Sequence, residues 1–444
     1  MRKHHKRYGS LAVSALAALG AVTGLSAANA GTLQPAVVSA LPASFTPNLA
    51  ADATIGHPAA YALEQSPDAT TMYVGGQFDA VQNSARSVTL SRKNFVAFSA
   101  TTGTISSAVA PAFNGNVWAV RASGTALYVA GEFTTVTGPD GVAVTRRGLA
   151  KLDATTGAVD PSFKTPWRSG KAYDLQVVGG RVIVGGTFAG ALLALDPETG
   201  ADTGYLALGV SGSCVNNADC GTAGSPATSE PTYVYRFAIS SDGTHLVAIG
   251  NFVAPHPRAF MVDLGPAATL DPWYYQPLAN SCILPQTYPA YLRDVDFAPD
   301  GSYFVIAATG YVPQSGGVGR DICDAAARFD TAALAPYNPS WINYTGGDTL
   351  HSVVVTGAAV YVNGHNRWLD NPDGRDSCVT TCVARPGIGA IDPVTGRALA
   401  WNPGKTRGVG GKDLLATSRG LWVASDGQKI AGLYHYGIAL MPLP

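Results

Sequence analysis

Short stretches of alternating apolar and polar residues cover the chain from about residue 55 onward, and most of them end at a glycine-containing turn. Alternation with a period of two predicts half-buried β-strands, and helical periodicity is absent outside the first thirty residues. One signature recurs at the end of a strand: usually two small residues, then a polar residue and Phe. It occurs at residues 75–78, 130–133, 185–188 and 249–252, with degenerate copies at 308–311, 363–366 and 424–427.

The spacing of these seven copies predicts a repeat protein. The first three copies are 55 residues apart, and the later spacings fall between about 55 and 64 residues. In the second copy, residues 116–122 and 126–133 alternate as two strands. A long loop then leads to a strand at 148–153, and a tight turn leads to another at 158–163. Each copy therefore predicts four antiparallel strands, with hairpin turns at the first and third connections.

The two ends of the chain complement each other. The last copy supplies three strands and lacks the fourth, and a segment that matches the missing strand occurs at residues 42–47. Pairing of that segment with the last sheet would close a ring and remove an exposed strand edge. We therefore predict an all-β fold, a seven-bladed β-propeller of four-stranded antiparallel blades, as a single domain over residues 31–444. The last blade would be closed by an N-terminal strand. An open β-solenoid and a ring with one blade more or fewer are the alternatives.

Several longer segments add a family resemblance. They are residues 147–153 leading to Asp-Pro-Ser-Phe at 160–163, residues 364–368, residues 387–396 leading to 401–404, and residues 420–426. With the glycine and Phe signature, they are similar to secreted actinobacterial β-propellers of the delta-60 repeat type. The resemblance covers nearly all of the chain after residue 30 and implies the propeller architecture. It transfers no catalytic residue, and the fifth and sixth copies depart from the pattern because they lose the glycine pair and carry Cys-bearing loops.

The first thirty residues have the pattern of a secretory signal peptide. Four basic residues near the start precede an apolar stretch from Leu11 to Leu25, and Ala28-Asn29-Ala30 supplies a cleavage site. No later segment approaches twenty apolar residues. We therefore expect residues 1–30 to be removed and the protein to be secreted and extracellular, without membrane insertion.

The cysteine count agrees with export. Six Cys residues follow the leader, and an even number in an exported chain implies up to three disulfides. Proximity in sequence favours Cys214 with Cys220 and Cys378 with Cys382, which leaves Cys282 for Cys323. All six lie in the long connections that the strand pattern places on one face of the ring. No His at ligand spacing accompanies them, and we expect no metal or other cofactor.

The charge balance limits the partners. The formal net charge is −1, and loss of the four basic leader residues leaves 25 Lys and Arg against 30 Asp and Glu. A mildly acidic chain gives no electrostatic hold on nucleic acid, anionic lipid or polyanionic polymer. We expect a monomer whose partner is an extracellular glycan or protein.

Alignment of the innermost strands brings two rows of side chains to the mouth of the central channel. The first row contains Tyr61, Trp118, Tyr173, Tyr235, Arg293, His351 and Lys412. The following positions contain Ala62, Ala119, Asp174, Arg236, Asp294, Ser352 and Asp413. A sugar would stack on the aromatic half and a carboxylate would meet the cationic half. The alternative is that the aromatic residues pack between blades while the charged residues pair locally.

The densest polar segment is residues 365–376, in which His365, Arg367 and Trp368 are further candidate ligand contacts. Its aspartates are three residues apart, unlike the alternate-residue pattern of an EF-hand loop. A calcium site there is a weaker interpretation than a solvated, disulfide-braced loop.

Catalytic motifs are few: the chain has no Gly-x-Ser-x-Gly, no His-Glu-x-x-His and no phosphate-binding loop. The leading hypothesis is a secreted, disulfide-braced propeller that binds a glycan or protein ligand through one loop face. An extracellular hydrolase or lyase acting at the channel mouth is the main alternative, because Asp174, Asp294, Asp296 and Asp413 can converge there. A structural envelope protein is the third class.

Overall fold

The computed structural model describes residues 32–50, 55–214, 220, 230–379 and 381–444. The predicted leader at residues 1–30 lies outside them. The described chain is β-structure apart from one 3-10 helix, η1 (Gln276–Ala279). None of its helices has the length and apolar character needed to cross a membrane.

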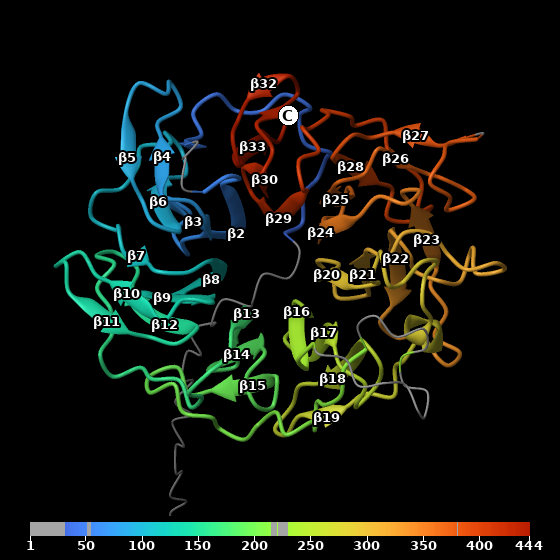
Figure 1. Ribbon diagram of the computed structural model, residues 1–444, viewed down its shortest axis with the longest axis horizontal. Helices are drawn as coiled ribbons and strands as arrows, with labels where there is room; N and C mark the ends of the chain where they lie inside the picture. The colour runs from blue at the N-terminus through green and yellow to red at the C-terminus, as the bar shows by residue number, and fades with distance from the viewer. Residues whose placement is uncertain (1–31, 51–54, 215–219, 221–229, 380) are drawn as a thin grey trace, which may run out of the picture.

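The strands form a series of similar sheets around a common centre (Figure 1). In chain order, the main sheets are β2 (Ala59–Gln65), β3 (Thr71–Gln77), β6 (Phe95–Ser99); β8 (Val117–Ser123), β9 (Ala126–Gly131), β12 (Leu149–Asp153); β13 (Ala172–Val178), β14 (Arg181–Gly186), β15 (Leu192–Leu195); β16 (Tyr233–Ile239), β17 (His245–Asn251), β18 (Ala259–Asp263), β19 (Thr269–Leu270); β20 (Leu292–Phe297), β21 (Tyr303–Ala308), β22 (Ala325–Asp330), β23 (Trp341–Tyr344); β24 (Leu350–Val355), β25 (Val360–Gly364), β28 (Ile388–Ile391); and β29 (Gly411–Thr417), β30 (Gly420–Ser425), β33 (Ile438–Pro442).

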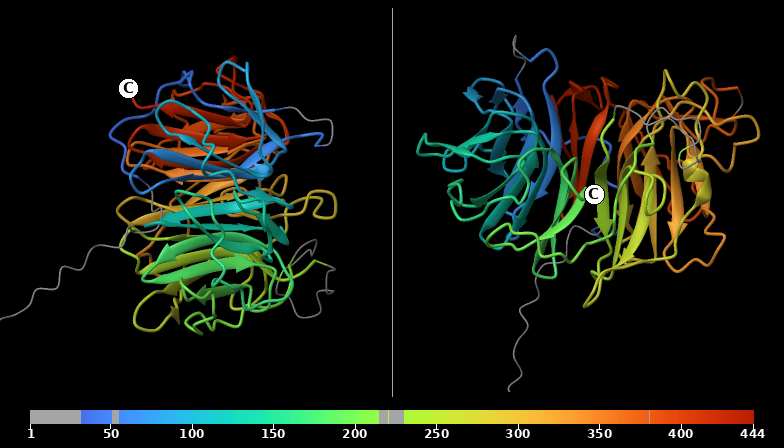
Figure 2. Two further views of the ribbon diagram at one scale, coloured as in Figure 1. Left: turned by 90° about the vertical axis from the view of Figure 1, so that its left-hand side faces the viewer. Right: turned by 60° about the horizontal axis from the view of Figure 1, so that its bottom comes forward.

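The first strand of each main sheet lies nearest the centre. Each of these strands contacts the first strand of the next sheet, and β29 also contacts β2. In Figure 2 the strands run through the thickness of the molecule, so each sheet stands on edge around the centre. All of the strand pairs are antiparallel. This radial arrangement is that of a β-propeller, and the all-β prediction is confirmed.

Apolar clusters fill the spaces between neighbouring sheets. The Phe residues of the signature, Phe78, Phe133, Phe188 and Phe252, are all buried. Between the last and first sheets, the rings of Trp422 in β30 and Phe98 in β6 lie 5.8 Å apart. Burial of such rings contributes about 2 kcal/mol each to folding.

The prediction of four strands holds for two of the main sheets, and the others have three. In four of those, the fourth segment forms a single bridge, such as Leu152 with Val159 or Ile391 with Ala398. Pro161 follows Val159 by two residues and has no N–H to donate, so the ladder cannot continue. The sequence pattern indicated the position of the fourth segment but overestimated its regularity.

The N-terminal segment lies beside β33, although residues 42–47 form no regular strand. The backbone N–H of Ser39 donates to Pro442 O (2.7 Å), and that of Ala43 donates to Leu440 O (2.8 Å). Pro42 and Pro47 cannot donate, which prevents a continuous ladder. The segment therefore follows the predicted path through separate hydrogen bonds.

Short accessory strands occur in the long connections at one end of the sheets. They are β1 (Asn48–Leu49) with β4 (Ala80–Gln82) and β5 (Thr89–Ser91); β7 (Ala112–Phe113) with β10 (Thr135–Thr137) and β11 (Ala143–Thr145); β26 (Trp368–Leu369) with β27 (Val383–Ala384); and β31 (Lys429–Ile430) with β32 (Leu433–Tyr434). Because antiparallel strands reverse at each turn, these connections share one face with the crossovers between sheets. We call this face the loop face.

Candidate functional site

Every innermost strand contains a register shift at one residue. In β2, for example, Ala60 pairs with Gly76 and Ala62 pairs with Gly75, so Tyr61 is an extra residue. The extra residues of all the innermost strands are Tyr61, Trp118, Tyr173, Tyr235, Arg293, His351 and Lys412. They are the first row expected from sequence, and a β-bulge explains why they share an orientation, since a bulge redirects one side chain out of the ladder.

The glycine signature makes room for this bulge. A Cβ on Gly76 would lie 2.2 Å from Ala59 O, and the equivalent distance from Gly131 to Asn116 O is also 2.2 Å. Gly186, Gly250 and Gly364 face the same obstacle. The signature was identified in the sequence as a repeat marker, and in the structure it is the partner of the bulged residue on the neighbouring strand.

The aromatic members of the row pack against each other. The rings of Tyr61 and Trp118 are stacked with centroids 4.4 Å apart, Trp118 meets Tyr173 edge-on at 6.1 Å, and Tyr173 lies 5.4 Å from Tyr235. Tyr61 and Trp118 therefore each cover one face of the other, which agrees with the alternative that the aromatic residues pack against one another.

The basic residues of the row lie on either side of the aromatic residues. The Lys412 Nζ lies 5.9 Å from the Tyr61 ring centre, and the Arg293 guanidinium lies 5.9 Å from the ring centre of Tyr235. Burial lowers the pKa of His351 well below its usual value, and the charges of Lys412 and Arg293 lower it further. His351 is therefore neutral at pH 7. We refer to the seven bulged side chains together as the mouth arc.

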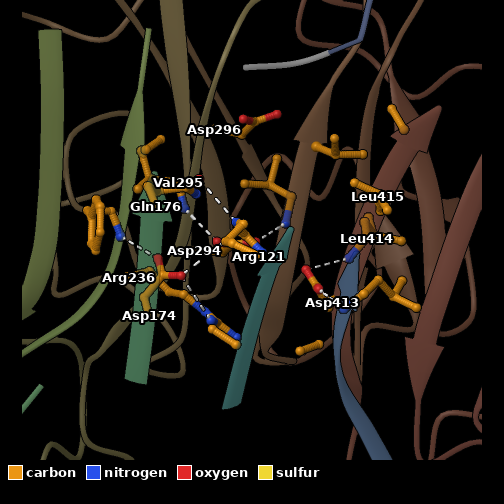
Figure 3. A pocket seen from close by; sticks show the side chains of 18 of the residues that line it. Arg121, Asp174, Gln176, Arg236, Asp294, Val295, Asp296, Asp413, Leu414 and Leu415 are labelled. Carbon is orange, nitrogen blue, oxygen red and sulfur yellow. Dashed lines mark hydrogen bonds and ion pairs between the residues drawn. The ribbon is translucent and has the colours of Figure 1, made fainter. Parts of the chain in front are cut away.

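The second row, apart from Ser352, lines a separate cavity of about 70 Å³ on the axis (Figure 3). Asp174, Arg236, Asp294 and Asp413 contribute to its wall, and Trp118 is the only member of the mouth arc among the described lining residues. This volume holds a few water molecules and is well below the roughly 300 Å³ at which small-molecule pockets begin. The sequence predicted a single site, whereas the structure has two separate parts, the mouth arc and a narrow polar cavity.

The carboxylates of the cavity connect neighbouring sheets. Asp174 Oδ2 accepts a hydrogen bond from the backbone N–H of Phe237 (3.0 Å), and Asp294 Oδ2 accepts one from Val353 N (2.9 Å). Asp413 Oδ2 accepts from Leu63 N (2.8 Å), which joins β29 to β2. An inner strand is the edge of its sheet, so some of its backbone N–H groups have no partner strand. The carboxylates accept hydrogen bonds from these N–H groups, which would otherwise be buried without an acceptor.

Asp174 also carries the ionic contacts of the cavity. Arg236 Nη1 lies 3.6 Å and Arg121 Nη2 lies 3.9 Å from Asp174 Oδ1 (Figure 3). Burial opposes the charge of Arg236, but the nearby Asp174, Asp294 and Asp413 outweigh it and raise its pKa. Arg236 is thus a fixed cation in the wall of the cavity.

Burial raises the pKa of Asp294 to about 7, partly offset by Arg236 and reinforced by Asp413. The pKa of Asp296 lies well above its usual value, chiefly because of burial. Asp413 is raised in the same direction by burial, against the opposing effect of Arg236. Asp294 therefore exchanges a proton near neutral pH while Arg236 stays charged.

The next layer lies two positions after the second row, and only its Asp296 was predicted from sequence. Glu64, Arg121 and Gln176 hold the same positions in β2, β8 and β13, and Arg121 Nε donates to Gln176 Oε1 (3.0 Å). Strand residues two apart point to the same side of a sheet. Counting two residues onward from each predicted position would have identified them.

The loop candidates are held by contacts within the loop face. Arg367 Nε lies 2.6 Å from Asp348 Oδ2, a second nitrogen of Arg367 pairs with Asp376, and the guanidinium lies 4.2 Å from the Trp368 ring centre. The carbonyl of His365 accepts a hydrogen bond from Arg407 Nε (2.8 Å). These interactions favour a bracing role for Arg367 and Trp368 over ligand contact.

The aspartates considered for calcium point to different partners. Asp370 accepts hydrogen bonds from Asn343 Nδ2 and Ala398 N, and Asp376 pairs with Arg367. Within the described ranges, no group of three or more His, Cys, Asp or Glu side chains has the arrangement of a metal site.

The three disulfides have the predicted pairing: Cys214 with Cys220, Cys282 with Cys323, and Cys378 with Cys382. The first and third close short loops, and the second joins the β19–β20 crossover to the β21–β22 connection. All six Cys residues lie in connections on the loop face. Three disulfides indicate an oxidising compartment.

Comparison with known proteins adds little to this picture. No protein-family model matches the chain, and no curated protein matches it. Among solved structures, the chain is similar to the β-propeller domain of Cps50 (Swd1) from Myceliophteria thermophila. The two share 10% sequence identity with a TM-score of 0.39, over 69% of this chain and 80% of that one.

Proposed function

We propose that this chain is a secreted binding module that recognises an extracellular glycan through the mouth arc on the loop face. The observation that carries the proposal is that every innermost strand directs its bulged side chain to the same place. Four of these side chains are aromatic and three are basic, and all of them except the buried Tyr61 are partly accessible. Aromatic edges and cationic donors on a rigid scaffold are typical of ligand recognition, whereas packing alone needs neither Arg nor Lys.

We further propose that the main sheets are the seven blades of a closed ring, related to the delta-60 repeat propellers. Three observations support closure: the hydrogen bond from Leu63 N to Asp413, the packing of Phe98 on Trp422, and the path of the N-terminal segment beside β33. The leader pattern and the three disulfides support secretion. We infer a monomer that needs no cofactor or calcium for binding.

A hydrolase acting at the cavity is the second candidate, because Asp294 titrates near neutral pH and lies close to the fixed charge of Arg236. Two contacts weigh against it. Both carboxylate oxygens of Asp294 accept backbone N–H groups, from Val295 and Val353. The cavity is also too small for a sugar ring.

A matched pair of tryptophans tests the binding proposal. Wild-type protein, Trp118→Leu and Trp368→Leu would be applied to a glycan array, and binding of each recognised glycan would be measured by calorimetry. We expect Trp118→Leu to weaken binding at least about tenfold, as for the loss of a buried aromatic contact, and Trp368→Leu to retain it. Absence of glycan binding by the wild type, or equal loss in both variants, would contradict the proposal.

The same protein tests the enzymatic alternative. A panel of chromogenic esters, lactones and glycosides would be incubated with wild-type protein and with Asp294→Asn. Turnover by the wild type that disappears in the variant would replace the binding module with an enzyme.

A further inference from the structure

Arg293 and Lys412 differ from the other basic residues near the axis. Arg121 and Arg236 face Asp174, and Arg367 and Arg407 face Asp348. For Arg293 and Lys412, no hydrogen bond or ion pair is formed with any residue that the structure describes, and Arg293 Nε is buried without an acceptor. The mouth arc therefore contains two cations whose charges lack a partner at contact distance.

The surroundings of Arg293 and Lys412 make the lack of an anionic partner unfavourable. Both are partly buried, and Arg293 lies over the Tyr291 ring at 4.4 Å from its centre. Burial lowers the pKa of Lys412, the charge of Asp426 opposes this effect, and the charge of Arg293 adds to it. The oxygens of Asp426 accept hydrogen bonds from Val409 N and Gly410 N. Holding two such cations together is unfavourable unless an anion joins them.

We propose that the ligand of the mouth arc is an acidic saccharide whose carboxylate binds between Arg293 and Lys412. This inference rests on the proposed function and specifies its ligand class. A uronic acid combines a carboxylate with the C–H groups of a rigid ring, and the arc places Tyr61 beside Lys412 and Tyr235 beside Arg293. An acidic peptide offers carboxylates on flexible stems, which gain less from rigid aromatic neighbours.

The overall charge limits the size of this ligand. The mature chain carries an excess of acidic residues, so its long-range field does not attract a polyanion. The charges of Arg293 and Lys412 can act on a bound ligand at contact distance. We therefore expect recognition of one acidic sugar at a time, such as a residue of a short uronate oligosaccharide.

The test measures the binding of trigalacturonate to the mature protein by isothermal titration calorimetry. Maltotriose is the neutral comparison and a Glu-rich peptide is the peptide comparison. The variants are Arg293→Gln and Lys412→Met, which remove one charge each, and Arg397→Gln is the matched control. Arg397 is an exposed residue of a tight turn at the opposite end of the sheets.

We expect trigalacturonate to bind to the wild type and to Arg397→Gln with equal affinity. Loss of either charge should raise Kd at least about tenfold, as for other charge-assisted hydrogen bonds. Lys412→Arg keeps the charge and should restore most of the affinity. This charge-retaining variant separates loss of recognition from loss of folding, which thermal unfolding of every variant also monitors.

The outcomes separate this inference from the function on which it rests. Glycan binding that is as tight for maltotriose as for trigalacturonate, or that is unchanged in Arg293→Gln and Lys412→Met, would overturn the acidic class and leave a glycan-binding module. Binding of the Glu-rich peptide alone would overturn both the proposal that the ligand is a glycan and the proposal that it is an acidic saccharide. Absence of binding to every saccharide would remove the proposed function itself.

Discussion

At the scale of single residues, a signature glycine and the bulged residue opposite form one unit in five of the seven main sheets, and Ala308 and Ser425 take the place of the glycine in the other two. Gly131 faces Asn116 O, and the adjacent bulge directs Trp118 into the mouth arc. The glycine is thus required by a neighbouring backbone and not by its own φ angle. The position of Trp118 in the mouth arc therefore depends on the absence of a side chain at Gly131 on the adjacent strand.

Gly131→Ala tests this dependence. The added Cβ would lie 2.2 Å from a backbone oxygen, so the strands must separate. We expect the free energy of unfolding to fall by about 2–4 kcal/mol. Gly265→Ala is the control, because its nearest neighbour is 3.6 Å away. Chemical denaturation measures both, and an equal effect of the two substitutions would contradict the steric explanation.

Asp294 gives a prediction for pH dependence. Its pKa is about 7 in the folded protein and close to 4 in the unfolded chain. Its contribution to stability is therefore fully present below about pH 4 and is lost as the pH rises toward 7. Asp294→Asn cannot ionise, so its stability relative to wild type should increase over that range by ~3 kcal/mol.

Denaturant titrations at pH 4, 5, 6 and 7 measure this change, with Asp300→Asn as the control. Asp300 is an exposed turn residue whose pKa is lowered, chiefly by its hydrogen bond with Ser302, so its contribution changes only below pH 4. A difference between Asp294→Asn and wild type that stays constant from pH 4 to 7 would refute the assignment.

At the scale of elements, sequence reasoning found the innermost strands and their first two rows but not what the second row does. The alternation placed Asp174, Asp294 and Asp413 correctly beside the axis. It could not show that their oxygens accept N–H groups from the next sheet, because such a contact joins residues about sixty or 350 positions apart. It also suggested that Trp118 offers a free stacking face, since a pattern along one strand does not show what a neighbouring strand covers.

The disulfides are the other elements on which the loop face depends. Cys282 and Cys323 are 41 residues apart, whereas Cys378 and Cys382 are four apart. Because the entropy lost by the unfolded chain grows with loop length, removal of the longer bridge should cost about 4 kcal/mol and removal of the shorter about 2 kcal/mol.

Paired Cys→Ser variants at each bridge, compared by thermal unfolding, measure the two costs. The reverse order, with the short bridge more important, would show that the enthalpy of local packing dominates over chain entropy.

At the scale of the whole molecule, the most distinctive prediction from sequence was that the N-terminal segment pairs with the last sheet. Residues 42–47 were assigned to the last blade because that blade lacked a fourth strand and because their sequence matches the missing segment. Their position beside β33 agrees with this reasoning, and their irregular pairing reflects two prolines whose effect on the ladder the repeat comparison ignored.

Deletion of residues 32–50 tests the importance of this segment. Loss of its hydrogen bonds to Pro442 and Leu440 exposes the edge of β33, so we expect a lower unfolding temperature and a shift from monomer to aggregate. Size-exclusion chromatography with light scattering measures the second effect. A truncated protein that remains monomeric and equally stable would contradict a role for the segment in completing the molecule.

The narrowness of the axial cavity has a consequence for the geometry of recognition. Arg121, Arg236 and Asp174 cross the axis below the arc and leave about 70 Å³. A polymer therefore cannot thread through the centre, as it does through a sliding clamp. If the arc binds a glycan as proposed, the sugar is contacted from outside the ring, at a terminus or along its flank, so chains that are cross-linked or have no free end can also bind.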